Sequence, residues 1–210
     1  MSNPLKKLEL RKVLLVGGIS DAVPFSPHTQ LSSTDSERLR VSCLDIQGYG
    51  IPIDDTYGPE GWLDYTIINI DPEQGGRDFL NSPESELTCD ILSVCNIAGF
   101  YVNDHSHLKQ PPNGAPYKGT SMDRRLFVSP HHDAERWRSA ILKTGAKIVI
   151  FEGDLSPSNI GMDQTGYILI GTGFSTDISY YYIHPDYLKE MVPHLPENSS
   201  LRAIPQKAKL

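Results

Sequence analysis

The sequence predicts an α/β fold: a doubly wound, mostly parallel, Rossmann-like sheet that ends in an antiparallel strand pair. Apolar, strand-like segments begin near residues 12, 41, 65 and 90, roughly one βα unit apart. A clear helix and a fifth apolar strand follow between residues 133 and 151. Two alternating segments after residue 166 predict the antiparallel pair.

Length and composition favour one domain. The chain has 210 residues, of which 39% are hydrophobic and 21% charged, which is typical of a globular protein with a sizeable core. We expect the core to span about residues 11–192 and an irregular tail to occupy 193–210. The net charge of −7 argues against a broad nucleic-acid or anionic-membrane surface and favours a small-molecule ligand, a protein partner or a homo-oligomer.

The cysteine pattern predicts a reducing compartment. Cys43, Cys89 and Cys95 form an odd set without a C-x-x-C pair, so we expect buried free thiols. No window approaches eighteen consecutive apolar residues, and the N-terminus has no long apolar stretch. The sequence therefore predicts a cytoplasmic protein that does not span a membrane.

The first two predicted strands each lead to a polar turn. Arg11–Ser20, R-K-V-L-L-V-G-G-I-S, is a short buried strand running into a turn at Gly17 and Gly18, whose backbone approaches either a ligand or another backbone. A short helix near 35–40 then precedes a second strand, Val41–Ile46, with Asp45 near its end.

The third and fourth predicted strands also end in polar residues. Tyr65–Ile70 is rich in β-branched residues and is followed by Asp71 and a proline. Asp90–Ile97 contains Asn96, and a long polar loop follows at residues 103–121. Loops of this length in a compact domain usually cover a site or else indicate a wrong element assignment.

The C-terminal half contains the clearest helix. A Ser-Pro pair and Gly145 bracket Asp133–Lys143 as its start and end signals. The strand Lys147–Phe151 follows, and Glu152 and Asp154 at its end are either a carboxylate pair or solvated residues at a strand end. Further predicted elements are an antiparallel pair at Gly166–Gly171 and Ser179–His184 and a helix at Asp186–Val192.

Ligands of open α/β sheets bind outside the carboxyl ends of the strands. The predicted strands place five polar or glycine residues along that edge: Gly17, Gly18, Asp45, Asp71 and Asn96. Each also has a structural interpretation. The glycine pair suits a tight turn, the two aspartates suit Asx turns or helix caps, and Asn96 can bond neighbouring backbone.

This order of a glycine turn, two acids, D-I-L-S-V-C-N-I and L-K-T-G-A-K-I-V-I-F resembles a divergent class I S-adenosylmethionine-dependent methyltransferase over roughly residues 11–184. The resemblance implies that Gly17 and Gly18 cradle the amino-acid end of the cofactor. It implies that Asp45 holds the ribose hydroxyls and that Asp71 or Asp78 meets the adenine. A second alignment makes Asp71 the ribose acid, but the first gives more even strand spacing.

The chain departs from that family in ways that imply an alternative function. The turn has one glycine pair where the family has three spaced glycines, and Leu15 or Val16 replaces the acid that normally precedes them. Asn96 is not part of the family's N-P-P-Y motif. A catalytically inactive, methyltransferase-like interaction module is therefore the second hypothesis.

Histidines suggest the catalytic base and a third hypothesis. The resemblance places a methyl acceptor beneath residues 103–128, where His105 or Asp104 would act as the base. His105 and His107 form an H-x-H pair, and His131 and His132 precede the clearest helix. These four histidines together could serve a metal-dependent hydrolase, although no stricter metal motif such as H-E-x-x-H is present.

Overall fold

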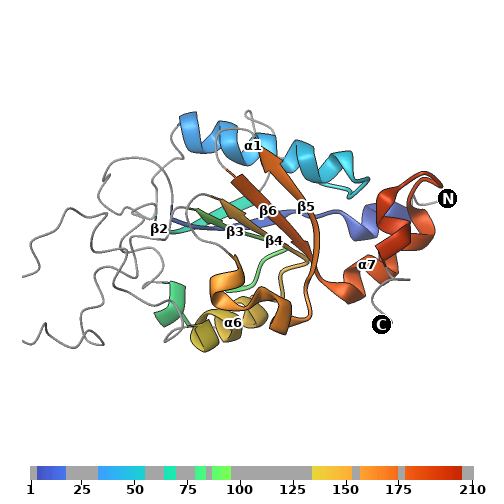
Figure 1. Ribbon diagram of the computed structural model, residues 1–210. Coiled ribbons are helices and arrows are strands. Elements are labelled where there is room, and N and C mark those ends of the chain that lie inside the picture. The colour runs from blue at the N-terminus through green and yellow to red at the C-terminus, as the bar shows by residue number, and fades with distance from the viewer. Residues whose placement is uncertain are drawn as a thin grey trace, which may run out of the picture.

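The computed structural model describes residues 4–17, 33–54, 64–69, 79–83, 87–95, 134–152, 157–174 and 178–204. Its centre is a six-stranded sheet with the order β2-β1-β3-β4-β6-β5 (Figure 1). The strands are β1 (Lys12–Val16), β2 (Asp64–Asn69), β3 (Ile91–Cys95), β4 (Ile148–Glu152), β5 (Ile168–Phe174) and β6 (Ile178–Ile183).

The sheet is mixed, as the sequence predicts. β1 pairs in parallel with β2 on one side and with β3 on the other, and β3 pairs in parallel with β4. β6 then runs antiparallel to both β4 and β5. The mostly parallel α/β sheet with an antiparallel pair at its end is therefore confirmed.

One predicted strand is wrong. Residues 41–46 lie within helix α1 (Ser33–Gly48), which also absorbs the short helix expected near residues 35–40. The apolar residues Leu39, Cys43 and Ile46 recur at the helical spacing of four and three positions, and all three are buried. Because β2 is thus the second strand of the chain, the preferred alignment with the methyltransferase family fails at this element.

Helix α6 (Ala134–Lys143) covers one face of the sheet and confirms the predicted helix (Figure 1). Its buried Trp137 and Ile141 pack with Leu14, Val94 and Phe151 from three strands. The helix ends where Gly145 adopts a φ of 62°, a left-handed conformation that glycine enters without a steric penalty.

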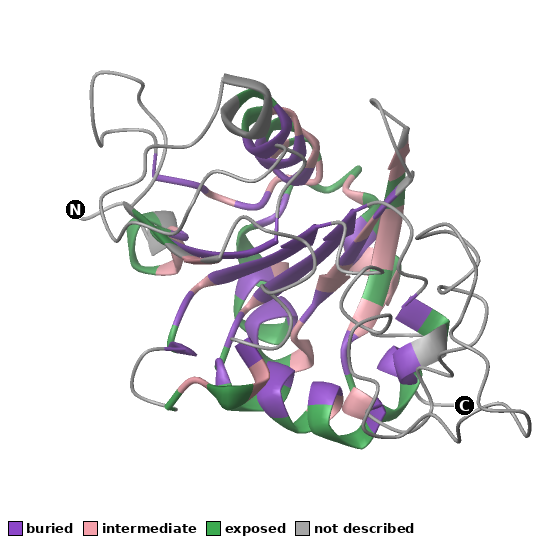
Figure 2. Ribbon diagram, turned by 90° about the vertical axis from the view of Figure 1, so that its left-hand side faces the viewer, coloured by how far each residue is buried: buried purple, intermediate pink, exposed green. Residues whose placement is uncertain are grey.

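Helix α1 and the C-terminal helix α7 (Pro185–Met191) pack on the opposite face. Leu39 and Leu188 of these helices share a buried cluster with Val13, Ile150 and Tyr181 of the strands. Alternate residues of each strand therefore lie in two separate apolar layers, one on each face of the sheet, as a sheet covered on both faces requires. Figure 2 shows buried residues along the central strands and on the helix surfaces turned toward them.

Short 3-10 helices complete the described structure: Pro4–Leu8, Pro157–Ile160, Met162–Thr165, Val192–His194 and Ser200–Ala203. Beyond residue 193, where the sequence indicates an irregular tail, Leu195 and Leu201 are buried in the α1 and α7 layer. None of the described helices has the length and apolar character needed to cross a membrane.

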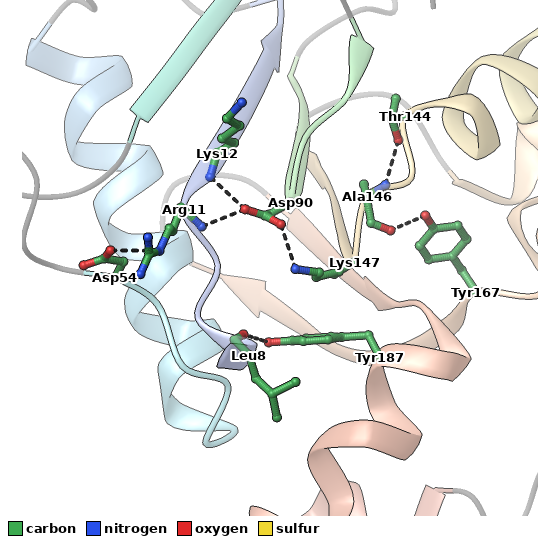
Figure 3. Close-up of polar contacts among 10 residues, drawn as sticks. All are labelled: Leu8, Arg11, Lys12, Asp54, Asp90, Thr144, Ala146, Lys147, Tyr167 and Tyr187. Carbon is green, nitrogen blue, oxygen red and sulfur yellow. Dashed lines mark hydrogen bonds and ion pairs between the residues drawn. The ribbon is translucent and has the colours of Figure 1, made fainter. Parts of the chain in front are cut away.

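A polar network ties the amino ends of the strands together (Figure 3). The Asp90 carboxylate accepts hydrogen bonds from the backbone N–H groups of Arg11 and Lys12 at 2.9 and 3.0 Å. It also accepts a 2.8 Å bond from Lys147 Nζ, which lies over the ring of Tyr187. One carboxylate thus connects β1, β3 and β4 at this edge. We call Arg11, Lys12, Asp90 and Lys147 the amino-edge network.

Candidate functional site

The strand order reverses direction at β1. The chain passes from β1 to β2 on one side and then to β3 on the other, so the carboxyl ends of β1 and β3 form the switch point where open α/β sheets bind ligands. Val16 at the end of β1 pairs with Val94 of β3. Carrying this register one residue further places Gly17 beside Cys95. Gly17 has a φ of 75°, so the chain turns sharply there in a conformation that favours glycine.

A buried polar cluster lies next to this turn. We call Arg38, Ser42, Cys95 and Glu152 the carboxyl-edge cluster. Arg38 Nη1 donates to Cys95 Sγ at 3.1 Å, and the Ser42 hydroxyl donates to a carboxylate oxygen of Glu152. Arg38 Nε lies 3.9 Å from Glu152 Oε2. Two residues of α1 thus meet the carboxyl ends of β3 and β4.

Strand alternation explains why these groups share one face. Val94 and Phe151 point into the layer beneath α6, so the next residues, Cys95 and Glu152, face α1. Cys95 and Glu152 are also direct neighbours in the parallel register between β3 and β4. On the face turned toward α1, β3 and β4 therefore change from apolar to polar residues at their carboxyl ends.

The charges of the cluster are almost fully removed from solvent. Arg38 is 8% exposed and Glu152 is 5% exposed. Taking both ions out of water has a desolvation cost that can equal or exceed their mutual attraction. The separation of 3.9 Å is also longer than a charge-assisted hydrogen bond. A buried ion pair of this kind contributes little net stability compared with apolar residues of similar size.

Asp45 lies on α1 and does not end a strand, which corrects its predicted role. Its carboxylate accepts a 2.8 Å hydrogen bond from the hydroxyl of Tyr181 on β6. Gly173 of β5 leaves room for this contact, because a Cβ there would come within 2.9 Å of Asp45 Oδ2. Burial, followed by the bond to Asp45, raises the pKa of Tyr181, so its hydroxyl stays protonated and donates. Asp45 thus fastens α1 to the antiparallel strands.

The three cysteines are free and buried, as the sequence predicts. Burial is the main cause that raises the pKa of both Cys43 and Cys89 to about 12. The thiolate is the nucleophilic form of cysteine, and it is scarce at neutral pH for these two side chains. Cys43 and Cys89 are therefore packing residues.

Several predicted site residues lie outside the described residues. These are Gly18, Asp71, Asn96, Asp104 and His105, together with Asp78, Asp154 and the remaining histidines of the metal hypothesis, His107, His131 and His132. Within the described part of the chain, no group of three or more His, Cys, Asp or Glu side chains could hold a metal ion. Gly17 is the predicted cofactor-binding residue whose position at the switch point the structure describes.

Sequence reasoning identified Glu152 as a polar strand end but missed Arg38 and Ser42. Both lie on α1, in or beside the segment interpreted as a strand. The signal that could have found them is the helical spacing of Arg38 and Ser42, which puts one cation and one hydroxyl on the same helix face.

Comparisons with known proteins assign neither a family nor a function to this chain. No protein-family description, curated protein or solved structure matches this chain at a significant level. The functional conclusion therefore rests on the chain's own residues.

Proposed function

We propose that this chain is an S-adenosylmethionine-dependent methyltransferase with a Rossmann-like fold. The observation that carries the proposal is the glycine turn at the switch point: β1 ends at Val16, and Gly17 turns with a positive φ beside the end of β3. The antiparallel end formed by β5 and β6, which the resemblance to this family implies, supports the same assignment.

The structure changes which acid we assign to the ribose. β2 is hydrogen-bonded directly to β1, so the carboxyl ends of these strands are neighbours at the sheet edge. Asp71 follows β2 by two positions in the sequence, whereas Asp45 is engaged by Tyr181. We therefore assign the ribose contact to Asp71, as in the second alignment. Asn96 directly follows β3 and remains a predicted ligand contact.

In methyl transfer, the protein mainly positions the acceptor and the methyl donor relative to each other. S-adenosylmethionine supplies an electrophilic methyl group that an acceptor attacks in line. The protein has to align the acceptor with that group and exclude water, which is where most of the rate gain of such a transfer arises. His105 or Asp104 is the predicted base for the acceptor, whose identity the sequence leaves open.

Titration calorimetry tests the proposal without knowledge of the acceptor. We expect both S-adenosylmethionine and its demethylated product S-adenosylhomocysteine to bind at micromolar concentrations. Failure of both ligands to bind at high micromolar concentration would refute the proposal.

Two glycine variants form a matched pair for this experiment. Gly17→Ala places a Cβ in a left-handed turn at the proposed site, and Gly145→Ala does the same in the turn between α6 and β4. Both variants bear a similar conformational cost of about 1–2 kcal/mol. Only Gly17→Ala should weaken ligand binding. Equal loss of binding in both folded variants would mean that the effect comes from stability alone.

The second candidate is a methyltransferase-like interaction module without activity. A specific observation favours it: Leu15 and Val16, which stand where the family has an acid, are buried apolar residues. This candidate predicts a stably folded protein that binds neither ligand and retains a macromolecular partner. The calorimetric experiment therefore separates the two candidates.

A further inference from the structure

His184 joins the end of β6 to the start of α7, and its ring caps the helix. Its Nδ1 accepts a 3.2 Å hydrogen bond from the backbone N–H of Asp186, and its backbone is extended, as at an N-cap position. We infer that His184 is a proton-operated cap, which secures the first turn of α7 when the ring is neutral and releases that turn when the ring is protonated. This inference is independent of the proposed function.

The first argument is the direction of the hydrogen bond. A backbone N–H only donates, so Nδ1 of His184 offers its lone pair, and the proton of the neutral ring lies on Nε2. An imidazolium carries a proton on both nitrogens and has no acceptor left. Protonation therefore removes this cap completely. Histidine changes charge between about pH 5 and 8, whereas the common cap residues serine, threonine and asparagine keep their acceptor throughout that range.

The second argument is the charge of the helix start. The N-terminus of a helix carries a partial positive charge from its unpaired N–H groups, so a cation at the N-cap position is unfavourable. Pro185 occupies the first helical position and has no N–H, which makes the Asp186 N–H the first backbone donor of α7. The bond to His184 is thus the cap of that donor, and its loss coincides with the arrival of a like charge.

One charged neighbour on α7 acts in the opposite direction. The hydrogen bond from Lys189 lowers the pKa of Asp186, so this carboxylate is ionised at neutral pH and attracts an imidazolium at His184. Its effect is limited for two reasons. The carboxylate is exposed to water, which screens it, and it already pairs with Lys189 at 2.9 Å.

The groups that reach His184 from the other elements are neutral at the point of contact. The Tyr167 ring, just before β5, packs edge to face with the imidazole at 5.3 Å between centroids, and burial raises its pKa, so the hydroxyl stays protonated. At the start of β4, the Lys147 carbonyl accepts a 2.8 Å bond from the His184 backbone N–H, while the Lys147 ammonium pairs with Asp90. These contacts hold the backbone of His184 in place in both protonation states.

The turn under this control attaches the N-terminal segment. The Leu188 N–H donates to the His184 carbonyl at 3.0 Å and closes the first turn of α7. Tyr187, in the same turn, donates its hydroxyl to the Leu8 carbonyl at 2.7 Å. Opening of this turn at acidic pH therefore loosens the attachment of the segment that ends at Leu8.

Nitrogen and amide NMR on the unmodified protein test the inference. At pH 8 we expect the His184 ring to show the tautomer protonated at Nε2. Between pH 7.5 and 5.5, the hydrogen-exchange protection factor of the Leu188 amide should fall about fivefold, the effect of losing one N-cap. That of Thr144, which donates to Ala140 in α6, should stay constant. The opposite tautomer, or constant protection at Leu188, would overturn the inference.

Variants separate the proton from the cap itself. His184→Asn keeps an acceptor that does not titrate, so Leu188 should stay protected at both pH values, whereas His184→Ala should leave it weakly protected at both. His194→Asn, at an exposed position after α7, is the matched control and should follow the wild type. Equal pH dependence in His184→Asn and the wild type would show that another group controls the turn and would refute the inference.

Discussion

The two edges of the parallel sheet carry ion pairs that differ in burial and in geometry. At the amino edge, Asp90 and Lys147 form a 2.8 Å ion pair whose side chains are 22% and 35% exposed. At the carboxyl edge, Arg38 and Glu152 are almost fully buried and lie 3.9 Å apart. The amino-edge pair has good geometry and access to water, as a stabilising contact requires, whereas the carboxyl-edge pair has neither. The difference indicates that the amino-edge pair is the better placed of the two to stabilise the fold.

Breaking the carboxyl-edge pair should have the largest effect on stability. Glu152→Ala removes the carboxylate that faces the buried Arg38 guanidinium, and loss of one partner of a buried pair costs about 3–5 kcal/mol of unfolding free energy. Urea denaturation measures this change. The double variant Arg38→Met with Glu152→Met removes both charges and should recover most of the loss. A double variant as unstable as Glu152→Ala would contradict the distinction, because the pair would then be intrinsically stabilising.

Removing the amino-edge charge should have an intermediate effect. Burial by itself would raise the pKa of Asp90, but the hydrogen bonds from Lys147 and from the backbone of Lys12 and Arg11 outweigh it and lower the pKa overall. Asp90→Asn should therefore cost about 1–2 kcal/mol of unfolding free energy at neutral pH, since partial exposure screens the pair. Urea denaturation at pH 7 is the measurement.

The lowered pKa of Asp90 also fixes the direction of its pH dependence. A carboxyl group with a depressed folded-state pKa contributes stability above its unfolded pKa of about 3.9, and this contribution disappears as the pH falls through the folded value. The stability difference between the wild type and Asp90→Asn should therefore be constant near neutral pH and shrink below about pH 4. A difference that grows on acidification would contradict the assignment.

The smallest effect is expected on the outer surface of α1. Arg40 donates two hydrogen bonds to Glu37 at 2.6 and 2.7 Å, but both side chains are largely exposed. Exposed ion pairs contribute little because water and salt screen them. The double variant Glu37→Ala with Arg40→Ala should leave the urea midpoint unchanged. A clear drop would show that short distance, rather than burial, decides how much these pairs contribute.

Local sequence patterns were sufficient for most of the sheet. The apolar run before Gly17 predicted β1, and the start and end signals around residues 133–145 predicted α6 and its link to β4. Val41–Ile46 misled because a short segment with four apolar residues among six fits a strand, while the spacing of Leu39, Cys43 and Ile46 that indicates a helix is seen only when Leu39 is included. A short apolar segment fits both the strand period of two residues and the helical period of 3.6, and tertiary packing decides which structure forms.

The carboxyl-edge cluster was beyond local patterns for a different reason. The contact between Arg38 and Cys95 joins residues 57 positions apart, and that between Ser42 and Glu152 joins residues 110 positions apart. An arginine in a polar segment is normally expected at the surface. Arg38 is buried because α1 packs over the carboxyl ends of β3 and β4, and a local pattern does not contain that information. Gly17, in contrast, was predictable because the turn follows from its own strand.

A crystal structure of the chain grown with excess S-adenosylhomocysteine tests the central claim most directly. We predict density for the ligand at the carboxyl ends of β1 and β3, with its amino-acid end beside Gly17. Density at another edge of the sheet would contradict the role of the glycine turn. A carboxyl edge without ligand, in crystals grown at millimolar concentration, would contradict the methyltransferase assignment itself.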